Sequence, residues 1–481
     1  MLLFFFVILT PRCSFHIRKF NRMEEKEVLG TKVPLQAIDK FVAPVQRFLK
    51  IESTAGIGLI AVTIIALLWA NLSNETYLAF WSLPFNFTIG PWSIDKALHH
   101  APTLGWLVND ALMTIFFFSV GLEVKGEIVH GELHDMRKAL LPVLAAIGGM
   151  IFPAVIYLVI CPGEAHHGWG IPMATDIAFT VGCMALLGTR IPHGLRVMIL
   201  TLAIADDIGS IIVVAVGYSS GVQWSALGIA VIFLTLTWLS FRLGIRNLFV
   251  HGVLAVISWF CFVQSGVHPT ICGVIIGLLT PVAPMVKRAY MDQLIVTVGD
   301  AVKENRPMTN DQRKEVLAML EKTSRESGSL QGRLNTHLQP WVNFVIMPLF
   351  ALANAGVVIE PSAVSLVTLS VALGLVIGKP LGIFLVSFAA IKAKICMLPT
   401  GVNWKILLGG GMLAGIGFTM SLFVAGLAFG DPAHATYLAG AKVGILTGSF
   451  ASAIFGILFM KIVSKPTNTP EESSSDAVEP V

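Results

Sequence analysis

The sequence predicts an all-α polytopic membrane protein, and three observations support this fold class. Hydrophobic residues fill 55% of the 481 positions and charged residues only 13%, whereas soluble domains carry about 25% charged residues. Apolar stretches of about 18 or more residues recur along most of the chain, and each is long enough to cross a bilayer core. Lys and Arg are concentrated in alternate connections between these stretches, as the positive-inside rule describes.

We predict about twelve transmembrane helices, which form one domain over residues 54–463. Their positions follow from the apolar runs between polar connections. Because the N-terminal arm and the connections after even-numbered spans are basic, both chain ends are predicted to be cytoplasmic. The predicted spans are 54–72, 103–123, 139–161, 170–188, 194–218, 222–241, 246–264, 268–286, 340–358, 364–388, 405–428 and 437–461.

Four segments are predicted to lie outside the membrane. Residues 1–53 form an N-terminal cytoplasmic arm, and residues 287–338, rich in Lys, Glu, Arg and Ser, form a long cytoplasmic loop. Residues 83–95 (LPFNFTIGPWSID) alternate partly between apolar and polar around an Ile-Gly-Pro turn, which predicts a small periplasmic β-hairpin. Residues 464–481 are too polar to bury a core, so we expect a disordered tail.

The chain begins with a short apolar run, MLLFFFVILT. This run is too short to span a bilayer, and basic residues follow it rather than precede it, unlike those of a secretory signal. We interpret it as an unused extension, with Met23 as the working start.

The composition gives no indication of a cofactor or a nucleic-acid partner. The six Cys residues are scattered without a paired metal or disulfide spacing, so they are expected to be packing residues. A net charge of +4 is too small to suggest nucleic acid, and the basic residues serve better as topology signals.

Two predicted spans contain residues that interrupt helices. Span 170–188 has Pro172 near its start, three residues before the polar pair Thr175-Asp176, and span 405–428 has five glycines before Thr419. Unwound backbone at membrane depth is tolerated only where it faces protein or a cavity. Interrupted spans in corresponding halves of a chain point to a transporter site.

A short internal similarity supports a repeat. Residues 174–182 can be laid on residues 418–426 after a one-residue shift, which matches Thr175 with Thr419 and gives two further identities. We therefore expect two discontinuous helices, in spans four and eleven, related by an inverted repeat.

Two adjacent acids lie deep in span five. Asp206 follows Gly194 by twelve residues, which places it about 18 Å into the span. A carboxylate at that depth costs about 2.5–3.5 kcal/mol on insertion scales. Asp206 and Asp207 point about 100° apart on a helix, so we expect them to have different partners.

Lys379, about fifteen residues into span ten, is the predicted charge partner. Asp176, Asp206 and Asp207 are its candidate counter-charges. The charges could simply pair to hold the bundle together, but three acids exceed one base. Two carboxylates about 5 Å apart repel by about 3 kcal/mol at an effective dielectric of about 20, so one must hold a proton or share a cation. Carboxylates suit hard cations, and the pattern predicts a site where Na⁺ or Li⁺ competes with protons.

The sequence closely resembles the NhaA family of bacterial sodium/proton antiporters, in matching order from about residue 35 to 462. The motifs that carry the resemblance are NDALMTIFFFSVGLEVKGE (109–127), IPMATDIAF (171–179), LAIADDIGSIIVV (202–214), GVHPTICGVIIG (266–277), LFALANAGV (349–357), GKPLGI (378–383) and GIGFTMSLF (415–423). The resemblance implies electrogenic Na⁺ or Li⁺ export against proton entry across a bacterial inner membrane, by a transporter that is not an enzyme.

The resemblance also assigns roles to the buried polar residues. Asp207 is implied to be the principal cation ligand, with Asp206 beside it and able to pair with Lys379. Asp176 and Thr175 are implied to screen the helix ends that face each other where the two interrupted spans cross. On this basis Na⁺ is expected at Asp206 and Asp207.

Further residues are matched outside that cluster. Glu123 and Glu127, four apart on one helix face, correspond to acids at the cytoplasmic mouth, although a solvated helix end is the alternative interpretation. His268 is expected to be structural or modulatory rather than a ligand. In GVHPT a proline follows it where the family has alanine, and in RLNTHLQPW (333–341) the family's acidic and histidine positions are partly replaced. Because of these two departures, the family's pH dependence is not implied. The 83–95 hairpin corresponds to a region that forms homodimers in the family.

Other classes of protein that use buried acids fit less well. An intramembrane aspartyl protease would carry Gly-x-Gly-Asp and Tyr-Asp motifs, and neither occurs. A prenyl-transfer enzyme needs repeated acids for magnesium and pyrophosphate, and DDIGS lacks the further acid. A passive cation channel agrees with the polarity, but a buried Lys beside coupled carboxylates favours a site that titrates.

Overall fold

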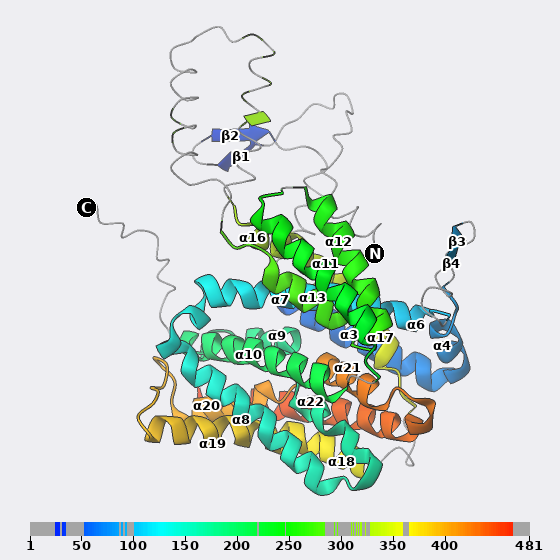
Figure 1. The fold of residues 1–481 in the computed structure, drawn as a ribbon. Coiled ribbons are helices and arrows are strands. Elements are labelled where there is room, and N and C mark those ends of the chain that lie inside the picture. The colour runs from blue at the N-terminus through cyan, green and yellow to red at the C-terminus, as the bar shows by residue number, and fades with distance from the viewer. Residues whose placement is uncertain are drawn as a thin grey trace. The chain divides into compact units, whose positions relative to one another are not determined.

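The computed structural model describes two compact units, which are treated separately below (Figure 1). Unit 1 comprises Met1–Ile51, Ser73–Asp135 and Ile211–Ala353, and unit 2 comprises Glu52–Leu72, Met136–Ser210 and Asn354–Val481. The structure describes residues 25–28, 31–34, 52–85, 88–89, 92–93, 101–218, 221–245, 247–283, 328–358 and 365–464, with single positions between 293 and 323.

Unit 2 is built from apolar helices, several of which are short or interrupted. Its elements are α3 (Glu52–Leu72), α8 (Met136–Ile160), η3 (Gly163–Met173), α9 (Ile177–Leu187), η4 (Gly188–Arg190), most of α10 (His193–Gly217), α18 (Leu366–Leu373), η7 (Gly374–Gly378), α19 (Lys379–Lys392), α20 (Trp404–Ala414), α21 (Phe418–Phe429), η8 (Pro432–His434) and α22 (Ala435–Val463).

In unit 2, α8 and α19 pack closely because glycines face each other. A Cβ built on Gly382 would collide with the backbone carbonyl oxygen of Gly148. Since α19 begins at Lys379, this contact fixes the helix that carries the lysine. The π-helix η7 directly precedes Lys379, and such π turns are frequent at functional sites.

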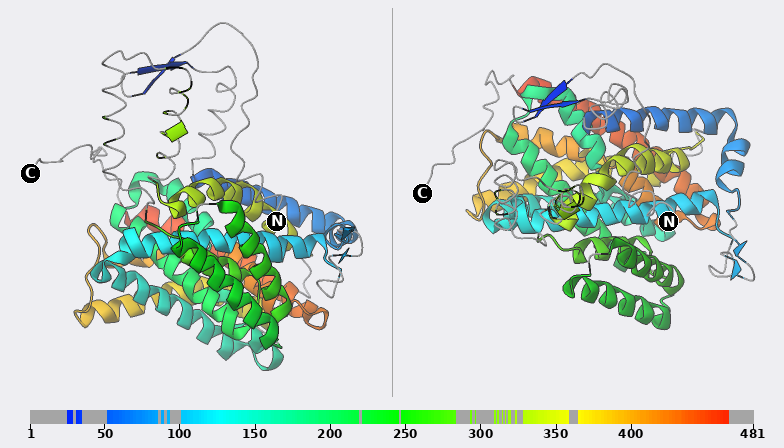
Figure 2. Two further views of the ribbon diagram at one scale, coloured as in Figure 1. Left: turned by 45° about the horizontal axis from the view of Figure 1, so that its top comes forward. Right: turned by 90° about the horizontal axis from the view of Figure 1, so that it is seen from above.

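The described part of unit 1 is also mainly helical, with two very short strand pairs. Its elements are β1 (Glu25–Val28), β2 (Thr31–Pro34), α4 (Asn74–Trp81), β3 (Thr88–Ile89), β4 (Trp92–Ser93), α6 (Leu104–Trp106), η1 (Leu107–Leu112), α7 (Met113–His130), η2 (Glu132–His134), α11 (Trp224–Arg242), α12 (Leu248–Ser265), α13 (Thr270–Leu279), α16 (Leu330–Trp341), η5 (Val342–Ile346) and α17 (Met347–Asn354). Helices α11 and α12 lie side by side, as the green pair in Figure 2.

The strands form antiparallel pairs. In β3 and β4, Thr88 faces Ser93 and Ile89 faces Trp92, within the 83–95 range where the sequence predicts a hairpin. The pairing of β1 with β2 and the helix α4 were not expected from the sequence.

The lengths and composition of the helices fit a multi-pass membrane protein. Among the described residues, eight helices are long and apolar enough to span a bilayer, or up to ten if each bent helix pair counts as one span. The bent pairs are η3 with α9–η4, at 47°, and α20 with α21, at 48°. Predicted spans 268–286 and 340–358 coincide with the ten-residue α13 and with α16–α17, neither of which is among those ten.

Some predictions fall on other parts of the chain. The apolar start with Met23, the tail after residue 464 and most of the 287–338 loop lie outside the described residues. The last part of that loop is described, and it contains the beginning of α16 at Leu330.

Candidate ion-binding site

The site begins where two bent helix pairs of unit 2 meet. Residues 174–176 separate η3 from α9, and residues 415–417 separate α20 from α21. The backbone N–H of Asp176 donates to the carbonyl oxygen of Ile416 at 2.7 Å. A Cβ on Gly417 would lie 2.9 Å from the carbonyl oxygen of Ala174, so the close approach requires glycine there.

Asp176 serves the N-termini of two helices at once. Its Oδ1 accepts from the N–H of Phe179 at 3.0 Å, at the start of α9. Its Oδ2 accepts from the N–H and the hydroxyl of Thr419, at 3.1 and 2.5 Å, at the start of α21. Helix N-termini carry positive partial charge and unsatisfied N–H groups. The buried carboxylate therefore neutralises both ends.

The opposite helix ends, which expose carbonyl oxygens, receive donors. The ammonium of Lys379 donates to the carbonyl of Met173, the last residue of η3. The hydroxyl of Thr180 donates to the carbonyl of Leu413 at 3.2 Å, near the end of α20. Positive charge and donors stabilise helix C-termini, so each end of the two breaks has a complementary partner.

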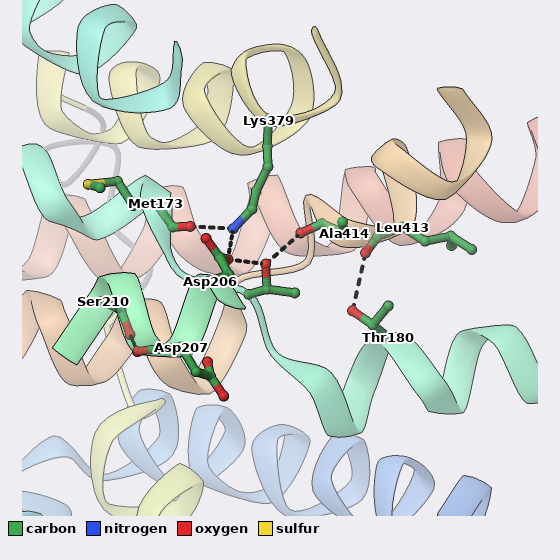
Figure 3. A network of polar contacts seen from close by, with 9 residues as sticks. Met173, Thr180, Asp206, Asp207, Ser210, Lys379, Leu413 and Ala414 are labelled. Atoms are coloured by element: carbon green, nitrogen blue, oxygen red, sulfur yellow. Dashed lines mark hydrogen bonds and ion pairs between the residues drawn. The ribbon is translucent and has the colours of Figure 1, made fainter. Parts of the chain in front are cut away.

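Lys379 and Thr175 converge on one oxygen of Asp206. Figure 3 shows the lysine reaching toward this aspartate. The lysine Nζ lies 2.7 Å from Asp206 Oδ2, and the threonine hydroxyl donates to the same oxygen at 2.5 Å. The exposed fractions of the lysine and aspartate side chains are 0% and 1%. The residue pattern alone left three acids as possible partners of Lys379, and the family resemblance implied Asp206. The structure pairs the lysine with Asp206.

Thr175 has two acceptors within reach but one proton. Its Oγ1 lies 2.5 Å from Asp206 Oδ2 and 3.3 Å from the carbonyl oxygen of Ala414. The short, charge-assisted bond to Asp206 is the stronger. If Asp206 ceased to accept, the proton could turn to Ala414, which links the state of the aspartate to the end of α20.

The remaining carboxylate oxygens differ in their surroundings. Asp206 Oδ1 is buried and has no hydrogen-bond partner. Asp207 is also buried, at 5% exposed, and its carboxylate points away from Lys379 in Figure 3. The two neighbouring acids of α10 therefore do not share one environment, as the helical geometry predicts.

The charges of this cluster do not balance. Asp176, Asp206 and Asp207 are buried with Lys379. The lysine contacts Asp206, and the two helix N-termini stabilise Asp176. Three buried carboxylates therefore share a single buried lysine in this cluster. A site with this shortage can take up a proton or a monovalent cation.

Other candidate residues belong to unit 1. Glu123 and Glu127 are half-buried on α7, and Glu127 Oε2 accepts from the N–H of Glu132 at 3.0 Å. This contact supports the start of η2. It gives Glu127 a local structural role in addition to the mouth role that the family resemblance implies.

His268 contacts an acid that the sequence analysis did not select. Its Nδ1 lies 2.8 Å from Thr270 Oγ1, and its Nε2 lies 3.6 Å from Asp110 Oδ1. Asp110 sits in the π-helix η1. The motif NDALM contains this acid inside a predicted span, which was the signal available in the sequence.

Thr419 and Thr180 were not selected as site residues either. The internal similarity matched Thr419 with Thr175, and both hydroxyls donate to buried aspartates. Nothing in the sequence pattern marked Thr180. Across the described part of the chain, no group of three or more His, Cys, Asp and Glu side chains could hold a metal ion.

These features define a multi-pass membrane protein with a buried acid–base cluster where two bent helix pairs meet. The chain belongs to the Na⁺/H⁺ antiporter 1 family, whose sequence profile matches residues 46–460. This is a family of transporters rather than enzymes.

Curated relatives agree over nearly the whole chain. It is 45% identical to Na(+)/H(+) antiporter NhaA of Rhodopirellula baltica, over 90% of this chain and 98% of the relative. It is 42% identical to Na(+)/H(+) antiporter NhaA 2 of Vibrio vulnificus, over 92% and 97%. It is 41% identical to Na(+)/H(+) antiporter NhaA of Rhizobium meliloti, over 91% and 98%.

Proposed function

We propose that this chain is a secondary transporter that exports Na⁺ or Li⁺ in exchange for protons taken up. Membership of the Na⁺/H⁺ antiporter 1 family and near full-length similarity to proteins named as Na⁺/H⁺ antiporters support this activity. In the cell it contributes to intracellular pH and sodium homeostasis.

The observation that carries the proposal is the unequal use of the two oxygens of Asp206. Oδ2 is held by Lys379 and Thr175, while Oδ1 is buried without a partner. A buried polar atom left unsatisfied costs about 1–3 kcal/mol, so it favours a proton or a cation beside it. Both ions would use the same carboxylates, and the arrival of one expels the other.

In this mechanism Asp207 is the principal cation ligand and Asp206 the second. Lys379 compensates Asp206 when no cation is bound, and Na⁺ or Li⁺ takes over that role on binding. If binding of one cation displaces one proton from Asp207 and one from the Lys379 ammonium, two positive charges are exchanged for one, and the exchange is electrogenic. Movement of the short helices around the crossing exposes the site to each side by turns.

The proposed membrane topology is that of a transporter with an inverted repeat. Twelve transmembrane helices with inverted repeats include two discontinuous helices, for which the similar bends of 47° and 48° are support. We place both termini in the cytoplasm, the protein in a bacterial inner membrane, and a homodimer contact at the 83–95 hairpin. Residues 1–53, 287–338 and 464–481 form the arm, loop and tail.

Three residues outside the cluster are proposed to modulate transport. Glu123 and Glu127 attract cations at the cytoplasmic mouth. His268, held between Thr270 and Asp110, acts as a structural or modulatory residue.

Transport in everted membrane vesicles tests the proposal. Na⁺ or Li⁺ added after a pH gradient has formed should collapse the gradient for the wild type, and Asp207→Asn should abolish this response because a neutral amide cannot exchange a proton for a cation. Asp311→Asn, at a side chain that is 93% exposed, is the matched control and should transport normally. Wild-type transport by Asp207→Asn would refute the assigned ligand.

A further inference from the structure

Two connections of unit 2 lie against each other at one end of its helices. Residues 186–196 join α9 to α10, and residues 392–405 join α19 to α20. A Cβ on Gly194 would lie 2.5 Å from the carbonyl oxygen of Thr400, and a Cβ on Gly401 would lie 3.5 Å from Pro192. The two connections therefore form one continuous surface.

This surface is strongly basic. Neither segment contains an Asp or a Glu. Arg190 donates to the carbonyl oxygen of Lys461 at 3.0 Å, at the end of α22. Four further cations are exposed, and we refer to them as the basic rim: Arg196, Lys392, Lys394 and Lys405.

Large apolar side chains are exposed among these cations. Met397 is 88% exposed and Ile395 is 57% exposed. The Nζ of Lys392 lies 5.8 Å from the ring centroid of Phe388, and Phe388 packs edge-on against Trp404, with 5.2 Å between centroids. Amphipathic aromatic and basic side chains of this kind gather where a protein meets lipid headgroups.

Lys394 occupies a position where glycine is usual. Its φ is +59°, and the N–H groups of Lys394 and Ile395 donate to the carbonyls of Ile391 and Ala390. This is the Schellman arrangement that ends a helix, and its left-handed residue is most often glycine. A lysine there has a conformational cost, so its charge is not explained by the backbone.

We propose that the basic rim binds the headgroup of an anionic phospholipid, while Met397 and Ile395 enter the adjoining acyl-chain region. Clustered cations attract anionic lipid surfaces, and the exposed apolar side chains favour a lipid over a soluble anion. The site is independent of ion exchange, because none of its residues belongs to the aspartate cluster.

Lipid retention by the purified full-length chain tests the proposal. Native mass spectrometry should show that phosphatidylglycerol is retained in preference to phosphatidylcholine. Each Lys→Ala substitution at 392, 394 or 405 should weaken that retention by about fivefold. Exchanging the same lysines for arginine should preserve it, and Lys314→Ala, at an exposed lysine paired with Asp311, should have no effect.

Lys394→Gly separates lipid binding from folding. Glycine suits the left-handed position, so this variant should have an unchanged or raised Tm in lipid-free detergent and yet retain less phosphatidylglycerol. Binding by the wild type should also weaken as choline chloride is raised. Equal retention of the two lipids, full retention by the triple Ala variant, or displacement of the lipid by inorganic phosphate at equal concentration would overturn the proposal.

Discussion

At the scale of single residues, the account depends on how charges are held in a buried site. Asp206 and Lys379 are almost fully buried and 2.7 Å apart. Burying an ion pair is expensive, and removing one partner costs more than the pair contributes because the other charge is left alone. Such a pair is retained for function more readily than for stability, which agrees with a role in ion exchange.

Replacing Lys379 with methionine tests this pairing. Lys379→Met leaves Asp206 Oδ2 with Thr175 as its remaining donor and removes the donor to the Met173 carbonyl. We expect the free energy of unfolding to fall by about 3–5 kcal/mol, measured as a lower Tm in detergent.

The double variant Lys379→Met with Asp206→Asn is the control. In the single variant the buried carboxylate of Asp206 loses its ammonium partner. The double variant also removes this negative charge, so it should regain most of the lost stability. A single variant as stable as the wild type would mean that the lysine does not compensate Asp206.

The sequence predicted the four charged residues of this cluster and Thr175, but not Thr180 and Thr419, nor the hydrogen bonds that connect these side chains. Burial of Asp176, Asp206, Asp207 and Lys379 followed from their depth in apolar runs. The choice of Asp206 as lysine partner depends on where α10 and α19 pass each other, which no local pattern encodes. For the same reason, the sequence could not show that Lys379 and Thr175 both donate hydrogen bonds to the same oxygen of Asp206.

At the scale of elements, the two breaks show what glycine and proline patterns can predict. Pro172 and the glycines before Thr419 indicated interrupted spans, and the structure bends there by 47° and 48°. The sequence did not reveal which glycines are required. The surrounding contacts decide which glycines are required. A Cβ on Gly417 would lie 2.9 Å from the carbonyl oxygen of Ala174, in the break between η3 and α9, whereas a Cβ on Gly426 would have no atom within 4 Å.

Packing of α19 on α8 gives an element-scale prediction. Gly382→Ala places a methyl group against the Gly148 carbonyl, so the helices must separate and Lys379 must move with α19. We expect a lower Tm and weaker antiport. Gly426→Ala, in α21 with open space around it, should be neutral or gain up to about 1 kcal/mol from helix propensity. Equal behaviour of the two variants would contradict the packing argument.

At the scale of the whole molecule, each of the twelve ranges that hydropathy predicted contains described helical residues, but eight to ten of the described helices are long and apolar enough to span a membrane. Within the described part of the segment predicted at 268–286, the helix covers Thr270–Leu279, and the polar start at His268 contacts Thr270 and Asp110. Helix α4 was missed because its eight residues, NETYLAFW, are too short to give a strong period.

Proton release on cation binding is the most direct test of competition at the buried aspartates. Calorimetric titration of the purified protein with Na⁺ or Li⁺, in buffers of different ionisation enthalpy, counts the protons released at each pH. We predict release for the wild type, and neither release nor binding for the double variant Asp206→Asn with Asp207→Asn. Cation binding that leaves the protonation of the protein unchanged at every pH would contradict the account.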